Sequence, residues 1–350
     1  VAEEARRIGL SEPDPAPPDV GAVAAAFGLP GAGGTLAPVT GGWSNRLFRL
    51  DTSSGSHAVK ELLNPWQESR FDERLAEAWR FERAALAAGV AMPAPIPEPV
   101  SGGCTADVAR QDGRGLARVR VHRWADGRPA AVGQPVAHDV ACWAGRTLAA
   151  LHALRCVPVD RGCFPTPNTE TADRWPALIE AARRAGAQWS ELLARAAASV
   201  ATVAALVRAG GHDPDLEVMG HADFSAKNLV LTRAGPVLCD WDVASPVVPR
   251  RELADAALSL GAWADLATAR EVVRAYREAG GDAAPVAPAD LGVALASRLD
   301  WIALNVEVAL GRRPATAEGR RAAEELLPQR LQNLPFMVET ALGVEPALNV

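Results

Sequence analysis

One segment constrains the fold of this chain more than any other, because it arranges three polar side chains around a predicted β-hairpin. It runs from His221 through Asp223 to Asn228, continues as two short apolar stretches joined at residues 232–235, and ends at Asp240. Apolar runs on either side of a glycine-containing turn predict two short antiparallel strands. Such a hairpin would return Asp240 to the neighbourhood of Asn228, and all three polar side chains would then face one cleft.

These three side chains have the chemistry that a phosphoryl-transfer site requires. Mg²⁺ takes hard oxygen ligands, typically one or two carboxylates with phosphate oxygens and water, and Asn228 and Asp240 can supply them. Asp223 is the candidate base for an acceptor hydroxyl, a role worth roughly 10²–10⁴-fold in rate. The order Asp, Asn, Asp is the order that kinase chemistry uses. Asp223 could instead cap backbone N–H groups, but the combined motif favours the catalytic interpretation.

A second segment upstream contains one of the two lysines among the 36 basic residues, the other being Lys227. Lys60 lies in a strand predicted at residues 56–62, which follows a turn at residues 51–55. Because side chains alternate along a strand, Ala58 and Lys60 share a face. The small Ala58 can admit an adenine there while the ammonium of Lys60 reaches the phosphates.

A glycine-containing stretch precedes this strand, and it includes Gly42, Ser44 and Asn45. It lacks a full G-x-G-x-x-G pattern, so it is weak evidence by itself. Its backbone N–H groups could nevertheless cover a phosphate.

Together these motifs resemble the aminoglycoside phosphotransferase and choline kinase family, small-molecule kinases with a protein-kinase-like fold. The sequence His221-Ala222-Asp223 stands where the family usually has His-Gly-Asp. Trp241-Asp242 follows the later aspartate where protein kinases have Phe-Gly. Neither departure removes a chemical group, and the resemblance covers roughly residues 35–310.

The resemblance implies an α+β, bilobal protein-kinase-like fold, with a small β-rich lobe containing one main helix and a larger, mostly helical lobe. The expected parts are a flexible arm at residues 1–19, a nucleotide-binding small lobe at 20–120, a hinge at 121–128 and a large lobe at 129–350. The large lobe would hold the catalytic loop, the metal site and the helices that bind the acceptor.

The resemblance also assigns residues around the nucleotide. Lys60 would bind phosphates and pair with a carboxylate on the helix predicted at residues 71–89, where Glu82 fits best and Glu77 is the runner-up. Backbone groups near the hinge would contact the purine, which makes Val121, Arg123 and Trp124 its neighbours.

Other polar residues near these motifs have less certain roles. Asp242 is either a second metal ligand or a turn residue, and the structural interpretation is favoured because Asp is common in turns. His221 is expected to hold the loop by hydrogen bonds, and His152 to be a core or interlobe histidine. Lys227 either touches the transferred phosphate or is solvated. Trp301 and Asn305 share a helix face that could line an acceptor pocket or belong to the core.

Composition bounds the partners of the chain. A net charge of −6 and a pI near 5.6 argue against general nucleic-acid binding. No apolar run is long enough to span a membrane, and no obligate protein partner is evident. The five cysteines lack paired or zinc-type spacing, which indicates reduced thiols in a cytoplasm and no structural metal.

The expected function is transfer of the γ-phosphoryl group of ATP or GTP, with Mg²⁺, to a hydroxyl of a small molecule. An antibiotic or a sugar or amino alcohol is the expected acceptor. The alternatives are a metabolic kinase of the choline or sugar type and a nucleotide-binding module without turnover. A protein kinase is disfavoured because the chain has no Asp-Phe-Gly with a following Ala-Pro-Glu.

Overall fold

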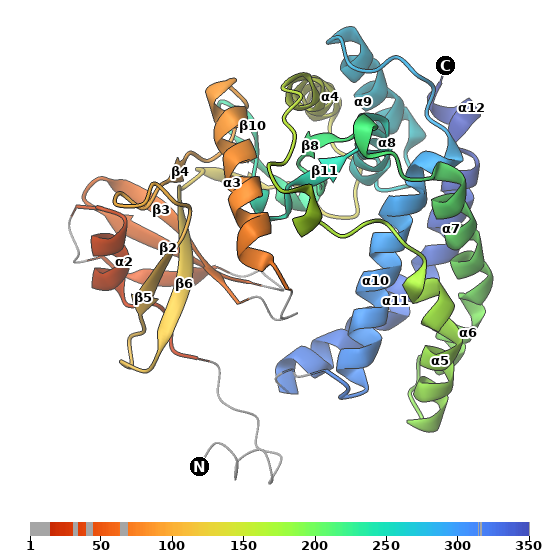
Figure 1. The fold of residues 1–350 in the computed structure, drawn as a ribbon, viewed down its shortest axis with the longest axis horizontal. Helices are drawn as coiled ribbons and strands as arrows, with labels where there is room; N and C mark the ends of the chain where they lie inside the picture. Colours follow the sequence, from red (N-terminus) through yellow and green to blue (C-terminus); the bar gives the residue numbers. More distant parts are fainter. Residues whose placement is uncertain are drawn as a thin grey trace.

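The computed structural model of the chain describes residues 15–30, 34–39, 45–63, 69–313, 315 and 317–349. Two lobes lie side by side in Figure 1, a strand-rich lobe at the left and a helical lobe at the right. This architecture confirms the expected α+β, kinase-like fold. Within the described residues, every helix is too short or too polar to span a lipid bilayer.

The small lobe is built on a six-stranded sheet in which every pairing is antiparallel. Its strand order is β1-β2-β3-β6-β4, and β5 pairs with β6. The strands are β1 (Leu36–Val39), β2 (Asn45–Thr52), β3 (Gly55–Leu62), β4 (Pro95–Ile96), β5 (Ala106–Ala109) and β6 (Leu116–Arg123). The predicted hairpin that contains Lys60 is therefore confirmed as β2 and β3, which turn at residues 53–54.

Side-chain alternation on β3 separates a core face from a cleft face. His57, Val59 and Glu61 are buried, whereas Ala58 and Lys60 are half-buried on the opposite face. Helix α2 (Val20–Ala26) covers part of the core face, and its N-cap Asp19 accepts a hydrogen bond from the Ala22 amide. Helix α3 (Phe71–Ala87) is the helix that the sequence predicted at residues 71–89. It runs between the sheet and the helical lobe (Figure 1).

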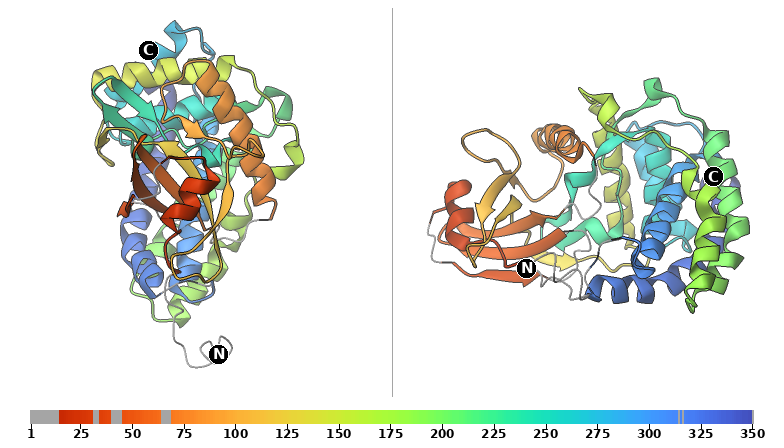
Figure 2. Two further views of the ribbon diagram at one scale, coloured as in Figure 1. Left: turned by 90° about the vertical axis from the view of Figure 1, so that its left-hand side faces the viewer. Right: turned by 60° about the horizontal axis from the view of Figure 1, so that its bottom comes forward.

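The large lobe contains most of the helices. They are α4 (His138–Ala153), α5 (Glu170–Arg184), α6 (Ser190–Arg195), α7 (Ala197–Gly210), α8 (Pro249–Leu260), α9 (Leu266–Glu278), α10 (Gly292–Ala309), α11 (Ala317–Leu342) and α12 (Val344–Leu348). The right-hand view of Figure 2 shows the same separation of a sheet lobe from a helical lobe.

Two small sheets lie where the lobes meet. One has the order β10-β9-β7 and is formed by β7 (Gly127–Pro129), β9 (Leu229–Thr232) and β10 (Gly235–Leu238). The other pairs β8 (Val218–Gly220) with β11 (Ser245–Val247). The hairpin β9–β10 is the one predicted between Asn228 and Asp240.

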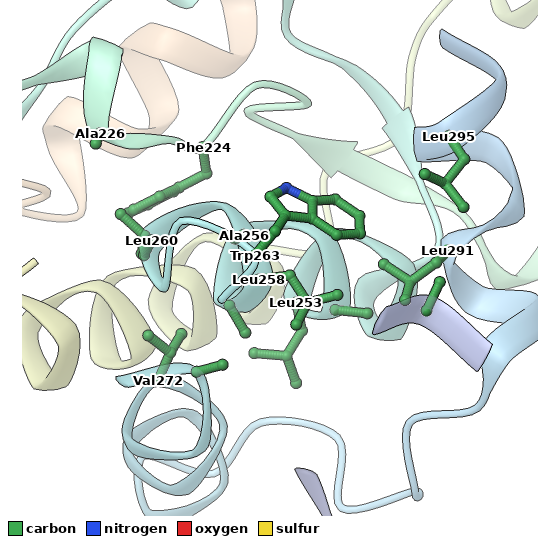
Figure 3. Packing of buried hydrophobic residues seen from close by; sticks show 14 of the residues in the cluster. Phe224, Ala226, Leu253, Ala256, Leu258, Leu260, Trp263, Val272, Leu291 and Leu295 are labelled. Atoms are coloured by element: carbon green, nitrogen blue, oxygen red, sulfur yellow. The ribbon is translucent and has the colours of Figure 1, made fainter. Parts of the chain in front are cut away.

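A large apolar core supports the segment between β8 and β9. Phe224 belongs to this segment, and Figure 3 shows its ring pointing toward Leu260 of α8. Trp263, Leu253 and Val272 belong to the same buried cluster. Burial of Phe224 fixes the position of the polar residues on either side of it.

The structure describes two segments that lie near expected boundaries between the parts of the chain. Residues 15–19 of the expected arm are docked on the small lobe, since Arg110 Nη1 donates to the carbonyl of Ala16 at 2.7 Å and Pro18 forms a β-bridge with Arg110; residues 1–14 lie outside the described residues. Strand β6 continues to Arg123, and β7 already pairs with the large lobe. Residues 124–126 therefore connect the two lobes, and they lie within the hinge expected at residues 121–128.

Candidate active site

The loop of residues 221–228 connects β8 to β9 and brings Asp223 beside Asn228. Asn228 Nδ2 donates to the backbone carbonyl of Asp223 at 2.8 Å and to its Oδ2 at 3.0 Å. Lys227 Nζ lies 2.8 Å from the same Oδ2. The Asp223 carboxylate is therefore oriented from two sides while 30% of its side chain stays exposed to the cleft.

The hairpin returns Asp240 to the 221–228 loop, as the sequence predicted. The Cys239 amide donates to the carbonyl of Asn228 at 2.8 Å. His221 is fully buried, and its Nε2 lies 2.9 Å from the carbonyl of Cys239. The structural role expected for His221 is confirmed, because these contacts join the loop to the end of β10.

A chain of buried hydrogen bonds holds the 221–228 loop from the large lobe. The Ala222 amide donates to Glu252 Oε1 at 2.6 Å, and Glu252 Oε2 lies 2.7 Å from His152 Nε2. The Tyr276 hydroxyl lies 2.9 Å from His152 Nδ1. Helices α4, α8 and α9 thereby fix Ala222, which adopts a left-handed backbone with φ 62°. The expectation of a satisfied core histidine at 152 is confirmed.

Lys60 reaches across the cleft to both aspartates of the Asp-Trp-Asp motif. Its Nζ lies 2.5 Å from Asp240 Oδ1 and 2.5 Å from Asp242 Oδ2. Desolvation by itself would raise the pKa of Asp240, but the Lys60 ammonium outweighs it and holds that pKa below its ordinary value. Asp240 is ionised at neutral pH, as a metal ligand must be.

The carboxylate expected to pair with Lys60 contacts other residues in this structure. Glu82 on α3 is fully buried but pairs with Arg120 of β6 and, at 2.9 Å, with His122 Nε2. Its pKa stays below the ordinary value because the charge of Arg120 outweighs desolvation. The runner-up Glu77 does not face Lys60 either, since it accepts from the amides of Val159 and Asp160.

Arg120 takes the position between these carboxylates because of the strand register. It lies directly opposite Lys60 on the neighbouring strand, so both cations are on one face of the sheet. The guanidinium contacts Glu82 on one side and Asp242 on the other. Asp242 is only 8% exposed, and each of its carboxylate oxygens faces a cation. These two contacts give Asp242 a structural role, in which it anchors the segment after Asp240 to the small lobe.

Some backbone groups of residues 121–124, which were expected to contact the purine, already form hydrogen bonds within the protein. Val121 is buried in the core of the small lobe and paired on both sides, with Val59 and with Ile96. The amide of Arg123 donates to Ala94 and that of Trp124 to Ser56. The amides of Arg123 and Trp124 are therefore engaged within the small lobe.

The expected phosphate-covering stretch is described only at its last residue. Gly42 and Ser44 lie outside the described residues. Asn45 begins β2, and its Oδ1 accepts a hydrogen bond from the Leu63 amide at 3.2 Å. Ala58 is half-buried beside Lys60 on β3, as predicted from strand alternation.

A second cluster of polar residues lies on helices α4 and α9. His138, Cys142 and Glu271 place one ligand atom each within 4.8 Å of one another. Arg274 contacts Glu271 at 2.8 Å and Cys142 Sγ at 3.6 Å. The guanidinium already neutralises Glu271 in this cluster.

Comparison with known proteins bears directly on this geometry. A family model described as the phosphotransferase enzyme family matches residues 35–288, which is more than half of the chain. The chain belongs to this family of small-molecule phosphotransferases. The matched range contains the Lys60 strand, the 221–228 loop and the hairpin that ends at Asp240. No curated protein matches the chain.

Solved structures of phosphotransferases share the fold. A spectinomycin phosphotransferase in complex with ADP and spectinomycin aligns at a TM-score of 0.63, with 16% identity over 89% of this chain and 93% of that one. A microcompartment-associated aminopropanol kinase aligns at 0.58, with 16% identity over 89% and 94%. A choline/ethanolamine kinase family protein from Mesorhizobium loti aligns at 0.50, with 19% identity over 91% and 96%.

The sequence did not single out two residues that contact the candidate site, Arg120 and Glu252. The alternation of basic and apolar residues at 117–122 indicated a strand with one cationic face, which was the available signal for Arg120. Glu252 is one of two acidic residues in helix α8, and nothing in its sequence neighbourhood marked it as buried.

Proposed function

We propose that the chain transfers the γ-phosphoryl group of ATP or GTP to a hydroxyl of a small molecule in a reaction that requires Mg²⁺. The observation that carries this proposal is the convergence of Asp223, Asn228, Asp240 and Lys60 from three separate segments. Membership of the phosphotransferase family supports it. Most of the rate enhancement in such a transfer comes from positioning and electrostatics.

The oxygen donors fit a magnesium ion. Asp240 is ionised and 39% exposed, and the amide nitrogen of Asn228 is engaged by Asp223, which leaves its oxygen as the metal-facing atom. Asn228 and Asp240 would hold Mg²⁺, which when bound neutralises charge on the phosphates.

The remaining residues act on the nucleotide and on the acceptor. Lys60 would leave Asp240 for the phosphates of the bound nucleotide. Ala58 leaves room for the purine, and the amide of Ala125, next after Trp124, can serve its edge because the two preceding amides are engaged. Asp223 accepts the proton of the acceptor hydroxyl as the new P–O bond forms and the bond to the nucleoside diphosphate breaks.

The acceptor class follows by analogy from the structural relatives. Spectinomycin and aminopropanol are named with two of them, so an aminoglycoside-like antibiotic or an amino alcohol heads the candidates, followed by sugars. The five cysteines are all free, which supports a cytoplasmic setting.

The test is nucleoside-diphosphate release from ATP and from GTP with Mg²⁺ over a panel of aminoglycosides, other antibiotics, amino alcohols and sugars. At least one acceptor should stimulate release. Asp223→Asn preserves the size of the side chain, and it should lower kcat by at least about 10² without weakening nucleotide binding. Full turnover by the Asn variant would refute the assignment of the base. Nucleotide binding without acceptor-dependent release by any compound would favour a binding module.

A further inference from the structure

Arg120 is buried in the middle of the site, and arginine is rarely fully buried unless it is paired. Only 1% of its side chain is exposed, and its guanidinium contacts Glu82 of α3 through Nη2 and Asp242 through Nη1. It also lies over the ring of Trp79, with 5.9 Å from Cζ to the centroid. One cation therefore connects the sheet, the helix of the small lobe and the segment that follows Asp240.

The contacts of Arg120 decide what Lys60 can do. Three carboxylates, those of Glu82, Asp240 and Asp242, share the two cations Lys60 and Arg120. Because Arg120 contacts both Glu82 and Asp242, Lys60 is left with the more exposed Asp240 and one oxygen of Asp242. Asp240 is 39% exposed and Asp242 is 8% exposed.

We propose that Arg120, rather than Lys60, ties helix α3 to the metal-binding segment, and that this clamp of Arg120, Glu82 and Asp242 releases Lys60 for the nucleotide phosphates. Arg120 is then a positioning residue, and Asp242 is an anchor instead of a second metal ligand. This inference rests on the proposed function, because it concerns nucleotide binding at the same site.

The clamp makes a directional prediction about nucleotide affinity. Without the guanidinium, Glu82 and Asp242 would both lack a full counter-charge, and the nearest remaining ammonium is that of Lys60. Lys60 would be held more strongly by carboxylates and would bind phosphates less well. Loss of Arg120 should therefore weaken nucleotide binding although Arg120 itself contacts no phosphate.

The experiment is a titration of ATP with Mg²⁺, measured by calorimetry, on the full-length wild type and on Arg120→Met. The matched control is Arg118→Met, because Arg118 lies on the same strand and also contacts α3, through Asp72, but is 37% exposed. We expect a dissociation constant about tenfold higher for Arg120→Met and an unchanged one for Arg118→Met. Equal affinities for the two variants would overturn the clamp.

A double-mutant cycle separates the clamp from two independent contributions. Asp242→Asn alone should weaken binding little, because it also removes one of the two carboxylates that Lys60 contacts. Combined with Arg120→Met, it should restore part of the affinity that Arg120→Met loses. Additive losses would instead assign Asp242 a role of its own, such as metal binding, and would overturn the proposal.

Two further results would also test the clamp, one from a second variant of Arg120 and one from the wild type. If Arg120→Met does not fold, Arg120→Lys keeps a buried charge that can reach one carboxylate at a time and should show a smaller loss. A folded Lys variant with wild-type affinity would count against the clamp. A wild type that binds neither ATP nor GTP would overturn the proposed function as well, whereas wild-type binding with unaffected variants would overturn the clamp alone.

Discussion

Two residues with left-handed backbones lie at the ends of the candidate active site. Ala222 has φ 62° and Asp240 has φ 66°, conformations that cost a non-glycine residue about 1–2 kcal/mol. The strain at Ala222 persists because the Glu252 carboxylate accepts a hydrogen bond from its amide. Such strain occurs where surrounding contacts over-determine the backbone next to functional groups.

The buried carboxylate of Glu252 predicts a pH dependence of stability. Desolvation alone would raise its pKa, but the hydrogen bond to His152 and that from the Ala222 amide hold the pKa below its ordinary value. A glutamate in the unfolded chain has a pKa of about 4.3. The stabilisation is therefore complete above that pH and is lost as the pH falls through the lower pKa of the folded state.

Glu252→Gln tests this dependence, because it keeps the shape of the side chain and removes its charge. We expect the free energy of unfolding to fall by about 2 kcal/mol at neutral pH. The difference from wild type should shrink as the pH drops below about 4.3. Urea unfolding at a series of pH values measures it, with the exposed Glu180→Gln as the control. A difference independent of pH would contradict this account.

At the scale of elements, the contact between helices α4 and α9 supports the 221–228 loop. These helices carry His152 and Tyr276, and they approach closely at Gly145. A Cβ at this position would collide with the carbonyl of Val272 and the amide of Tyr276. Backbone atoms cannot move aside as a flexible side chain could.

Gly145→Ala should therefore destabilise the protein although alanine is the better helix former. Helix propensity would favour the alanine by about 1 kcal/mol, whereas the overpacking costs about 1–3 kcal/mol. Thermal unfolding measures the net effect, and Ala150→Gly on the exposed side of α4 is the control for propensity alone. A higher melting temperature for Gly145→Ala would show that the helices separate at little cost.

The elements themselves could be predicted from the sequence to a large extent. Apolar runs and turns located the hairpins β2–β3 and β9–β10, and apolar periodicity located α3 and α4. These features depend on local residues. The partners of Glu82 could not be predicted, because they depend on strand register: Arg120 lies opposite Lys60 only through the pairing of β3 with β6.

Other features depended on contacts between distant segments. The docking of residues 15–19 follows from hydrogen bonds to Arg46 and Arg110, which a proline-rich stretch gives no reason to expect. The burial of Glu252 likewise requires α8 to pack below the 221–228 loop. The proximity of the motif residues Asp223, Asn228 and Asp240, in contrast, could be predicted, because the hairpin between them is a local feature of the sequence.

At the scale of the whole molecule, the residues of the candidate active site come from both lobes. The sheet lobe supplies Lys60, and the helical lobe supplies Asp223, Asn228 and Asp240. Lys60 already spans the cleft between them through its contacts with Asp240 and Asp242. The central claim is that Mg²⁺ and nucleotide bind jointly to this set, whereas Asp223 acts only on the acceptor.

Calorimetric titration of ATP into wild type, Asp223→Asn and Asp240→Asn, each with and without Mg²⁺, tests that claim most directly. Asp223→Asn should bind the magnesium nucleotide as wild type does. Asp240→Asn should bind it at least about tenfold more weakly, because a metal ligand is lost. Without Mg²⁺, the same variant should bind ATP as well as wild type or better, since Lys60 is freed from a carboxylate. If Asp240→Asn retains the wild-type response to Mg²⁺, the assignment of the metal site is wrong.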